Sequence, residues 1–227
     1  MRVPLNALIL LVIILATSAP AAPRVAPYLT PPPLALITRL VAPPPARGST
    51  AAHTDFARIL ELQRHRTRED IARCRAIGEA HVSQLFGAPY GPLTATEARA
   101  LDPLFDRVRD ETDAWVKLAK QLYQRPRPYR TDPRIEPCLP RDTSFAYPSG
   151  TAAIGAVYGD LLAHIDPARA AAFRARGEQV GADRVLAGVH HPSDVSAAQE
   201  LAHEIARRLW ESARFRHDLA RARASSR

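Results

Sequence analysis

The chain has 227 residues, of which 46% are hydrophobic, and carries a formal net charge of +8. This length is enough for one well-buried domain and thin for two. The arginines that carry most of the charge are scattered and lack the interleaved aromatic residues that stack nucleic-acid bases, so we expect no nucleic-acid binding. The charge is compatible with anionic small molecules.

The first 21 residues have the pattern of an export signal. Arg2 provides the positive start, an apolar run covers residues 5–16, and Ala19-Pro20-Ala21 is a small-residue cleavage site. The apolar run is too short for an ordinary membrane-spanning helix. We therefore expect a signal peptide over 1–21, a periplasmic or secreted location, and no stable membrane insertion after cleavage. An uncleaved anchor is the alternative.

Residues 22–50 are rich in proline and predict a leader that is extended over the domain or partly disordered. From residue 51 to residue 220 the apolar residues recur at helical spacing, with no alternating strand pattern of useful length. The basic residues 221–227 then form a tail. The predicted class is all-α, with one helical-bundle domain over residues 51–220.

Capping residues mark where several helices begin. Thr94 and Glu97 form a capping box that opens a short helix, and Asp102-Pro103 is expected to start a longer helix that ends before Pro126. Other helices are predicted after residue 51, over 68–85, from Ser149 to about His164, from Asp166-Pro167 toward Asp183, and from Pro192 to about Ser212.

Two cysteines, Cys74 and Cys138, fit an oxidising compartment. We favour a single disulfide between them, with two buried thiols as the alternative. Neither cysteine has metal-ligand spacing, and the sequence predicts no metal site and no cofactor.

The segment 183–194 contains an arginine, a histidine six residues later and an aspartate four residues after that. Pro192 favours the first turn of a helix, which puts His190 at the helix entrance and Asp194 about one turn on. The carboxylate can then orient the imidazole, and Arg184 supplies a fork suited to phosphate. This arrangement predicts a nucleophilic histidine beside an anion site. The alternative is a helix-terminal histidine with a solvated ion pair.

Two further segments offer groups for an anion. Lys120 lies near the end of a predicted helix and Arg127 in a proline-flanked turn, although basic residues at a helix C-terminus also simply complement the dipole. Ser149 and Gly150 open the next helix, whose free N–H groups can bind an anion. A plain helix cap is the commoner use of Ser-Gly.

Taken in order, the chain contains Lys-x6-Arg-Pro, then Pro-Ser-Gly, then Arg-x5-His-x3-Asp. This set resembles the three-part signature of the type 2 phosphatidic acid phosphatase superfamily, which includes the vanadium haloperoxidases. The chain is most similar to the bacterial class A non-specific acid phosphatases, over roughly residues 40–220. A haloperoxidase is the weaker interpretation.

The resemblance implies the fold of that superfamily and a metal-independent phosphomonoester hydrolase. His190 would attack phosphorus and form a phosphohistidine, and Asp194 would hold its ring in the attacking tautomer. Phosphate esters or inorganic phosphate would be the ligands, and relatives often form homo-oligomers. The residues implied in phosphate binding are Lys120, Arg127, Ser149, Gly150 and Arg184.

Two positions depart from the family pattern. Thr151 follows Pro-Ser-Gly where the family has the histidine that protonates the leaving oxygen and later activates water. Asp183 replaces the serine before the third-segment arginine. We consider three hypotheses: a phosphatase weakened or restricted to good leaving groups, a phosphatase in which Asp183 or His191 replaces the acid, and a degenerate protein that binds phosphate without useful turnover. Asp183 could also be a surface side chain pointing away.

Overall fold

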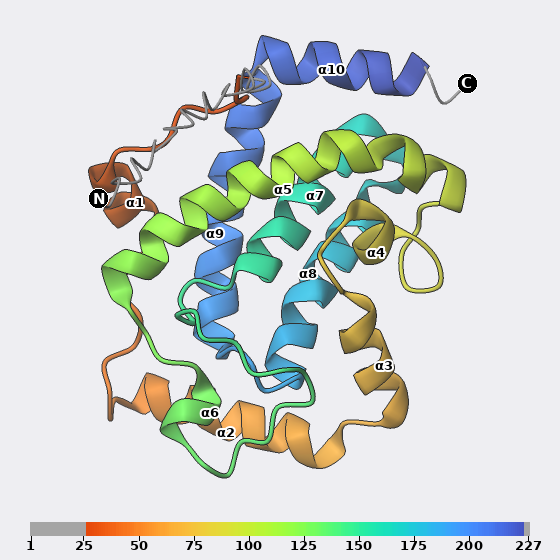
Figure 1. Ribbon diagram of the computed structural model, residues 1–227. Coiled ribbons are helices and arrows are strands. Elements are labelled where there is room, and N and C mark those ends of the chain that lie inside the picture. Colours follow the sequence, from red (N-terminus) through yellow and green to blue (C-terminus); the bar gives the residue numbers. More distant parts are fainter. Residues whose placement is uncertain (1–25, 225–227) are drawn as a thin grey trace, which may run out of the picture.

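The computed structural model describes residues 26–224, which form helices and no strand, so the all-α class is confirmed (Figure 1). The predicted signal peptide over 1–21 lies outside these residues. The elements are α1 (Leu34–Leu40), α2 (Thr50–His65), α3 (Arg68–Ala76), α4 (Val82–Phe86), α5 (Ala95–Tyr123), α6 (Pro128–Thr131), α7 (Gly150–Ile165), a short 3-10 helix (Pro167–Arg169), α8 (Ala170–Leu186), α9 (Pro192–Glu211) and α10 (Ala213–Ala224).

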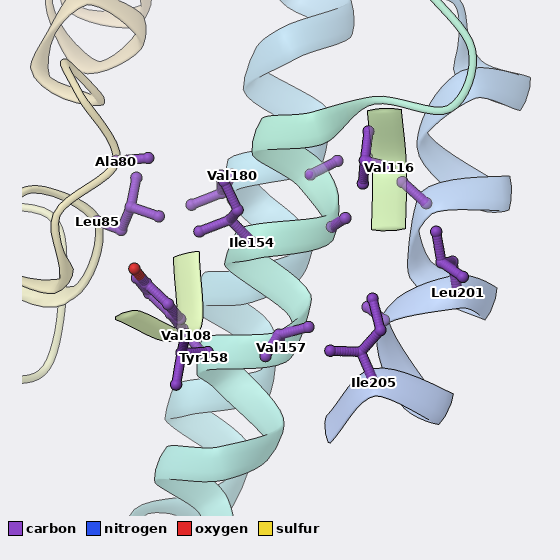
Figure 2. Close-up of a cluster of buried hydrophobic side chains, with 14 of the residues drawn as sticks. Ala80, Leu85, Val108, Val116, Ile154, Val157, Tyr158, Val180, Leu201 and Ile205 are labelled. Atoms are coloured by element: carbon purple, nitrogen blue, oxygen red, sulfur yellow. The ribbon is translucent and has the colours of Figure 1, made fainter. Parts of the chain in front are cut away.

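Helix α7 is the centre of the domain and packs against α5, α8 and α9 (Figure 1). A β-carbon built on Gly155 would lie 2.9 Å from Cβ of Val180, so the small residue lets α7 and α8 approach closely. Figure 2 shows branched side chains from several helices packed together around α7, among them Ile154 and Val157. This core fixes the start of α7, which matters for the site.

Helix α5 corrects the prediction of two separate helices over this stretch. The Thr94 capping box is confirmed, with Glu97 N donating to Thr94 Oγ1 at 3.2 Å and Thr94 N donating to Glu97 Oε2 at 2.8 Å. The helix nevertheless continues through Pro103 to Tyr123. A proline inside a helix costs about 3 kcal/mol, and the buried apolar stripe on both sides of it offsets that cost. Asp102 does not begin a helix of its own, and its carboxylate accepts from Ser83 N, in the first turn of α4, at 3.0 Å.

The helix expected over 68–85 is also wrong in extent. It is divided into α3 and α4 by a turn in which Gly78 has a φ of 50° and Ala80 a φ of 61°. Gly78 provides the left-handed conformation that commonly ends a helix. The turn brings Glu79 to the edge of the cavity described below.

Both ends of the described chain contain more structure than the sequence predicted. Within the proline-rich leader, α1 buries Ile37, and Val41 after it is also buried. The hydroxyl of Tyr147 donates to Ala42 O at 2.5 Å, which ties the leader to the domain. At the other end α10 runs to Ala224, so the first residues of the predicted tail are helical.

Three predicted helix starts are confirmed. Ser149 caps α7, with its side chain accepting from Ala152 N, and Asp166 accepts from Ala168 N at the start of the 3-10 helix that leads into α8. Pro192 is the first residue of α9, which ends at Glu211. None of the helices in residues 26–224 is both long and apolar enough to cross a membrane.

Cys74 and Cys138 are free thiols in the structure, so the favoured disulfide is not formed. The Cys74 thiol is buried and donates to Asp183 O at 3.3 Å. Cys138 is only partly buried. The alternative of two buried thiols is therefore met by Cys74 and only in part by Cys138.

Candidate active site

The three predicted segments meet at one cavity of about 320 Å³. Lys120 comes from the last turn of α5, Arg127 from the segment before α6, and Arg184 from the last turn of α8. The start of α7 and the loop before α9 complete this end of the cavity. This end of the cavity therefore brings the three cationic side chains together with Gly150, Thr151 and His190.

Lys120 is a buried cation whose ammonium group donates to the carbonyl oxygen of Phe145. Burial and, to a lesser degree, the nearby charge of Arg127 lower the pKa of Lys120 to about 8. Lys120 thus lies in a site that favours an added negative charge.

Arg127 connects the cationic cluster to the histidine. Its Nη1 donates to Val189 O at 3.0 Å and to Nε2 of His190 at 2.7 Å, and its Nη2 donates to Asp142 Oδ2 at 2.6 Å. Burial lowers its pKa from the ordinary value. These contacts fix the guanidinium plane beside the ring nitrogen that faces the cavity.

Arg184 differs from the other two cations because its buried Nε has no hydrogen-bond partner among the residues that the structure describes. Burial, assisted by Arg127, lowers the pKa of Arg184 to about 10. A buried donor without a partner costs about 1–3 kcal/mol. Arg184 therefore adds a buried positive charge to the cavity wall.

His190 is buried and held at both ring nitrogens. Nδ1 lies 3.3 Å from Asp194 Oδ2, and Nε2 accepts from Arg127. These partners require the proton on Nδ1 and the lone pair on Nε2, which faces the cavity. Burial lowers the pKa of His190 well below 6.5, and Arg127 acts in the same direction, so the ring is neutral at mildly acid pH.

Asp194 is fully buried and accepts several hydrogen bonds besides that of His190. Nη1 of Arg125 donates to its Oδ1 at 2.6 Å, while the backbone N and Nδ1 of His191 lie 2.8 and 3.0 Å from its Oδ2. Although burial raises the pKa of Asp194, the hydrogen bonds from His190 and His191 outweigh burial and hold it far below its ordinary value. The carboxylate therefore stays ionised.

Arg125 and Asp55 are buried residues that the sequence reading missed. Nη2 of Arg125 donates to Asp55 Oδ2 at 2.9 Å, and Asp55 also accepts from Ser193 N at 3.1 Å. The result is a charged chain from Asp55 through Arg125 and Asp194 to His190. No local pattern marks Asp55, because its partner lies 70 residues away.

Ser149 and Gly150 have different positions relative to the cavity. The Ser149 side chain is buried and accepts from Ala152 N at 3.4 Å, while its backbone N donates to Asp194 O at 2.9 Å. Ser149 thus ties α7 to α9 and is absent from the cavity wall. Gly150 and Thr151 line that wall directly, as the first two residues of α7.

Neither residue considered as a substitute acid faces this cavity. Asp183 is completely buried on the opposite side of α8, where it accepts from Nε of Arg73 at 2.9 Å and from Gln179 at 2.9 Å. It is therefore neither a surface side chain nor a neighbour of the phosphate site. His191 lines a different, larger cavity beside Phe56. Arg73 on α3 accounts for the orientation of Asp183, and the contact with Phe56 on α2 accounts for that of His191.

No protein-family model matches the chain. A non-specific acid phosphatase of Providencia stuartii is 29% identical to it over 194 residues, which are 81% of this chain and 78% of that protein. A non-specific acid phosphatase of Salmonella typhimurium is 33% identical over 110 residues, which are 46% of this chain and 44% of that protein. The second similarity thus spans less than half of either protein.

Two solved structures have a similar fold. A bacterial vanadium-dependent iodoperoxidase has a TM-score of 0.58 at 12% identity, covering 78% of this chain and 53% of its own. A transmembrane PAP2-type phosphatidylglycerolphosphate phosphatase from Bacillus subtilis has a TM-score of 0.55 at 19% identity. The match covers 79% of this chain and 95% of that chain. At these identities the likeness shows the fold alone. The resemblance to the non-specific acid phosphatases is confirmed by sequence, and the fold expected from that resemblance is confirmed by the two solved structures.

Proposed function

We propose that the protein is a phosphomonoester hydrolase that works through a phosphohistidine on His190 and is restricted to esters with good leaving groups. The observation that carries this proposal is the state of His190. Its Nε2 lone pair faces the cavity that Lys120, Arg127 and Arg184 line, and Asp194 holds the opposite nitrogen. The similarity to acid phosphatases supports phosphoester hydrolysis as the reaction class.

In the first step the phosphate group binds among Lys120, Arg127 and Arg184, which neutralise the charge on its equatorial oxygens. The Nε2 lone pair of His190 attacks phosphorus while the ester P–O bond breaks. Arg127 transfers its hydrogen bond from Nε2 to a phosphate oxygen, and Asp194 stabilises the positive charge that develops on the ring. These residues require no metal ion for the attack.

The leaving oxygen is where the site is weakened. Thr151 lies on the cavity wall, and its hydroxyl cannot supply a proton near neutral pH. Loss of a general acid typically costs about 10²–10⁴ in rate. Aryl phosphates and phosphoanhydrides depart with little protonation, so we expect them to be the substrates. In the second step water hydrolyses the phosphohistidine and releases inorganic phosphate.

The alternative is a protein that binds phosphate or phosphoesters without turnover, and Thr151 is the observation that favours it. Turnover of an aryl phosphate and an alkyl phosphate by the wild type and by Thr151→His separates the two functions. We expect aryl turnover in both proteins and alkyl turnover only in Thr151→His. Phosphate binding with no turnover in either protein would replace the hydrolase with the binding protein.

The cellular setting is part of the proposal. The sequence pattern of residues 1–21 supports export to the periplasm or secretion, and small phosphate esters or inorganic phosphate are the proposed ligands. Within residues 26–224 no group of three histidine, cysteine, aspartate or glutamate side chains could hold a metal ion. Activity in the presence of excess EDTA tests whether hydrolysis is metal-independent.

A further inference from the structure

The wall of the cavity also contains acidic side chains. Arg109 and four carboxylates contribute to this wall, and none of the four carboxylates belongs to the signature. The carboxylates are those of Glu79, Asp110, Asp113 and Asp142. One of them, Asp113, lies beside the start of α7, close to the position where the expected histidine is replaced by Thr151.

Asp113 is placed by the same helix as Lys120. The two residues are seven apart on α5, which is two helical turns, so they share the face that lines the cavity. A β-carbon built on Gly150 would lie 3.7 Å from Oδ1 of Asp113. Gly150 directly precedes Thr151, so the carboxylate oxygen lies against the first turn of α7.

The other three carboxylates are less suited to handle a proton over the phosphate. Both oxygens of Asp142 already accept hydrogen bonds, from Ser144 and from Nη2 of Arg127. Asp110 is paired with Arg109 and its side chain is 72% exposed. Glu79 is an exposed residue of the turn between α3 and α4.

Asp113 combines access to water with two oxygens that have different surroundings. Its side chain is 38% exposed, and Oδ2 forms an ion pair with Lys117 at 2.7 Å. The ion pair engages Oδ2, whereas Oδ1 is the oxygen that faces Gly150. Oδ1 is therefore placed at the start of α7 to accept a proton from water.

We propose that Asp113 is the general base of the second half-reaction, in which it accepts a proton from the water that hydrolyses the phosphohistidine of His190. The water oxygen forms a bond to phosphorus as the P–Nε2 bond breaks, and the bonding pair returns to the imidazole. The water proton moves to Asp113, which then releases it to solvent. This inference rests on the proposed function and explains how hydrolysis proceeds without the histidine at position 151.

Asp113→Asn tests the proposal in pre-steady-state kinetics with p-nitrophenyl phosphate. The first turnover and kcat/KM should stay near the wild-type values, because they report phosphorylation of His190. Steady-state kcat should fall on the order of 10²-fold or more, with a stoichiometric burst of nitrophenol and an accumulated phosphoenzyme trapped in alkali. KM should fall together with kcat.

Asp110→Asn is the matched control, because Asp110 lines the same cavity from the same helix. It should retain wild-type kcat, and thermal unfolding of both variants shows that they fold. In the Thr151→His background the effect of Asp113→Asn should shrink, since the new imidazole can accept the proton.

Three outcomes would overturn the proposal. Equal kcat in Asp113→Asn and Asp110→Asn, or a loss of the first turnover in Asp113→Asn, would remove Asp113 as the base while leaving the hydrolase in place. An undiminished loss in the Thr151→His background would also contradict it. No nitrophenol release by the wild type would reject the proposed function itself, and this inference with it.

Discussion

Two groups of side chains around the cavity differ in how they are held. Around His190, the charged side chains of Asp194, Arg125 and Asp55 are buried. Each of them is hydrogen-bonded to the next. By contrast, the side chains of Thr151 and Asp113, which line the same cavity, are only half-buried. Under the proposed function, the buried group would bind phosphate and attack it, and the half-buried group would transfer protons.

The buried group should dominate stability. Arg125→Ala would leave Asp55 and Asp194 as uncompensated buried charges, and breaking a buried ion pair costs ~3–5 kcal/mol. Denaturant unfolding measures this loss. Arg58→Ala is the control, because the Arg58–Glu61 pair is about half exposed and should contribute nothing measurable. Equal midpoints for the two variants would contradict the role assigned to Arg125.

A substitution of Asp183 should lower the stability of the protein without changing its substrate preference. Asp183→Asn removes the charge that faces Arg73 on α3, away from the cavity. We expect a loss of about 1–3 kcal/mol in the free energy of unfolding and an unchanged ratio of turnover between aryl phosphates with better and with poorer leaving groups. A selective loss of turnover for the poorer leaving groups would show instead that Asp183 supplies the missing proton.

The smallest expected effect is a change in pH dependence. Because burial lowers the pKa of Lys120 to about 8, its charge is present below that pH and lost above it. The kcat/KM for an aryl phosphate should therefore fall as the pH rises through about 8. It should persist below pH 6.5, since the depressed pKa of His190 keeps the ring neutral. Lys120→Arg should move the upper limit to higher pH, and a limit that stays in place would exclude Lys120 as its cause.

The sequence predicted the parts of the fold that depend on neighbouring residues. Caps at Thr94, Ser149 and Asp166 are confirmed because each cap forms its hydrogen bond within one turn. The same reading divided α5 at Pro103 and ran α3 into α4, because it weighed one proline above a long apolar stripe and overlooked Gly78 as a helix end. Those choices are decided by packing across the core.

The site shows the same division. The signature identified the residues that the structure brings to one cavity, but it gave no sign that the Ser149 side chain caps α7 and does not line the wall. Arg125 and Asp55 escaped detection because their pairing joins segments 70 residues apart. The orientation of the Asp183 side chain depends on its contact with Arg73 on α3. The sequence of α8 alone does not reveal this contact.

The central claim is that His190 becomes phosphorylated. The most direct measurement is an alkaline quench of the wild type during turnover of p-nitrophenyl phosphate, followed by mass spectrometry of the peptide that carries residues 185–207. The account predicts a phosphate on His190 that is stable in alkali and labile in acid, and none in His190→Ala. Turnover with an unmodified His190, or a phosphate on another residue, would contradict it.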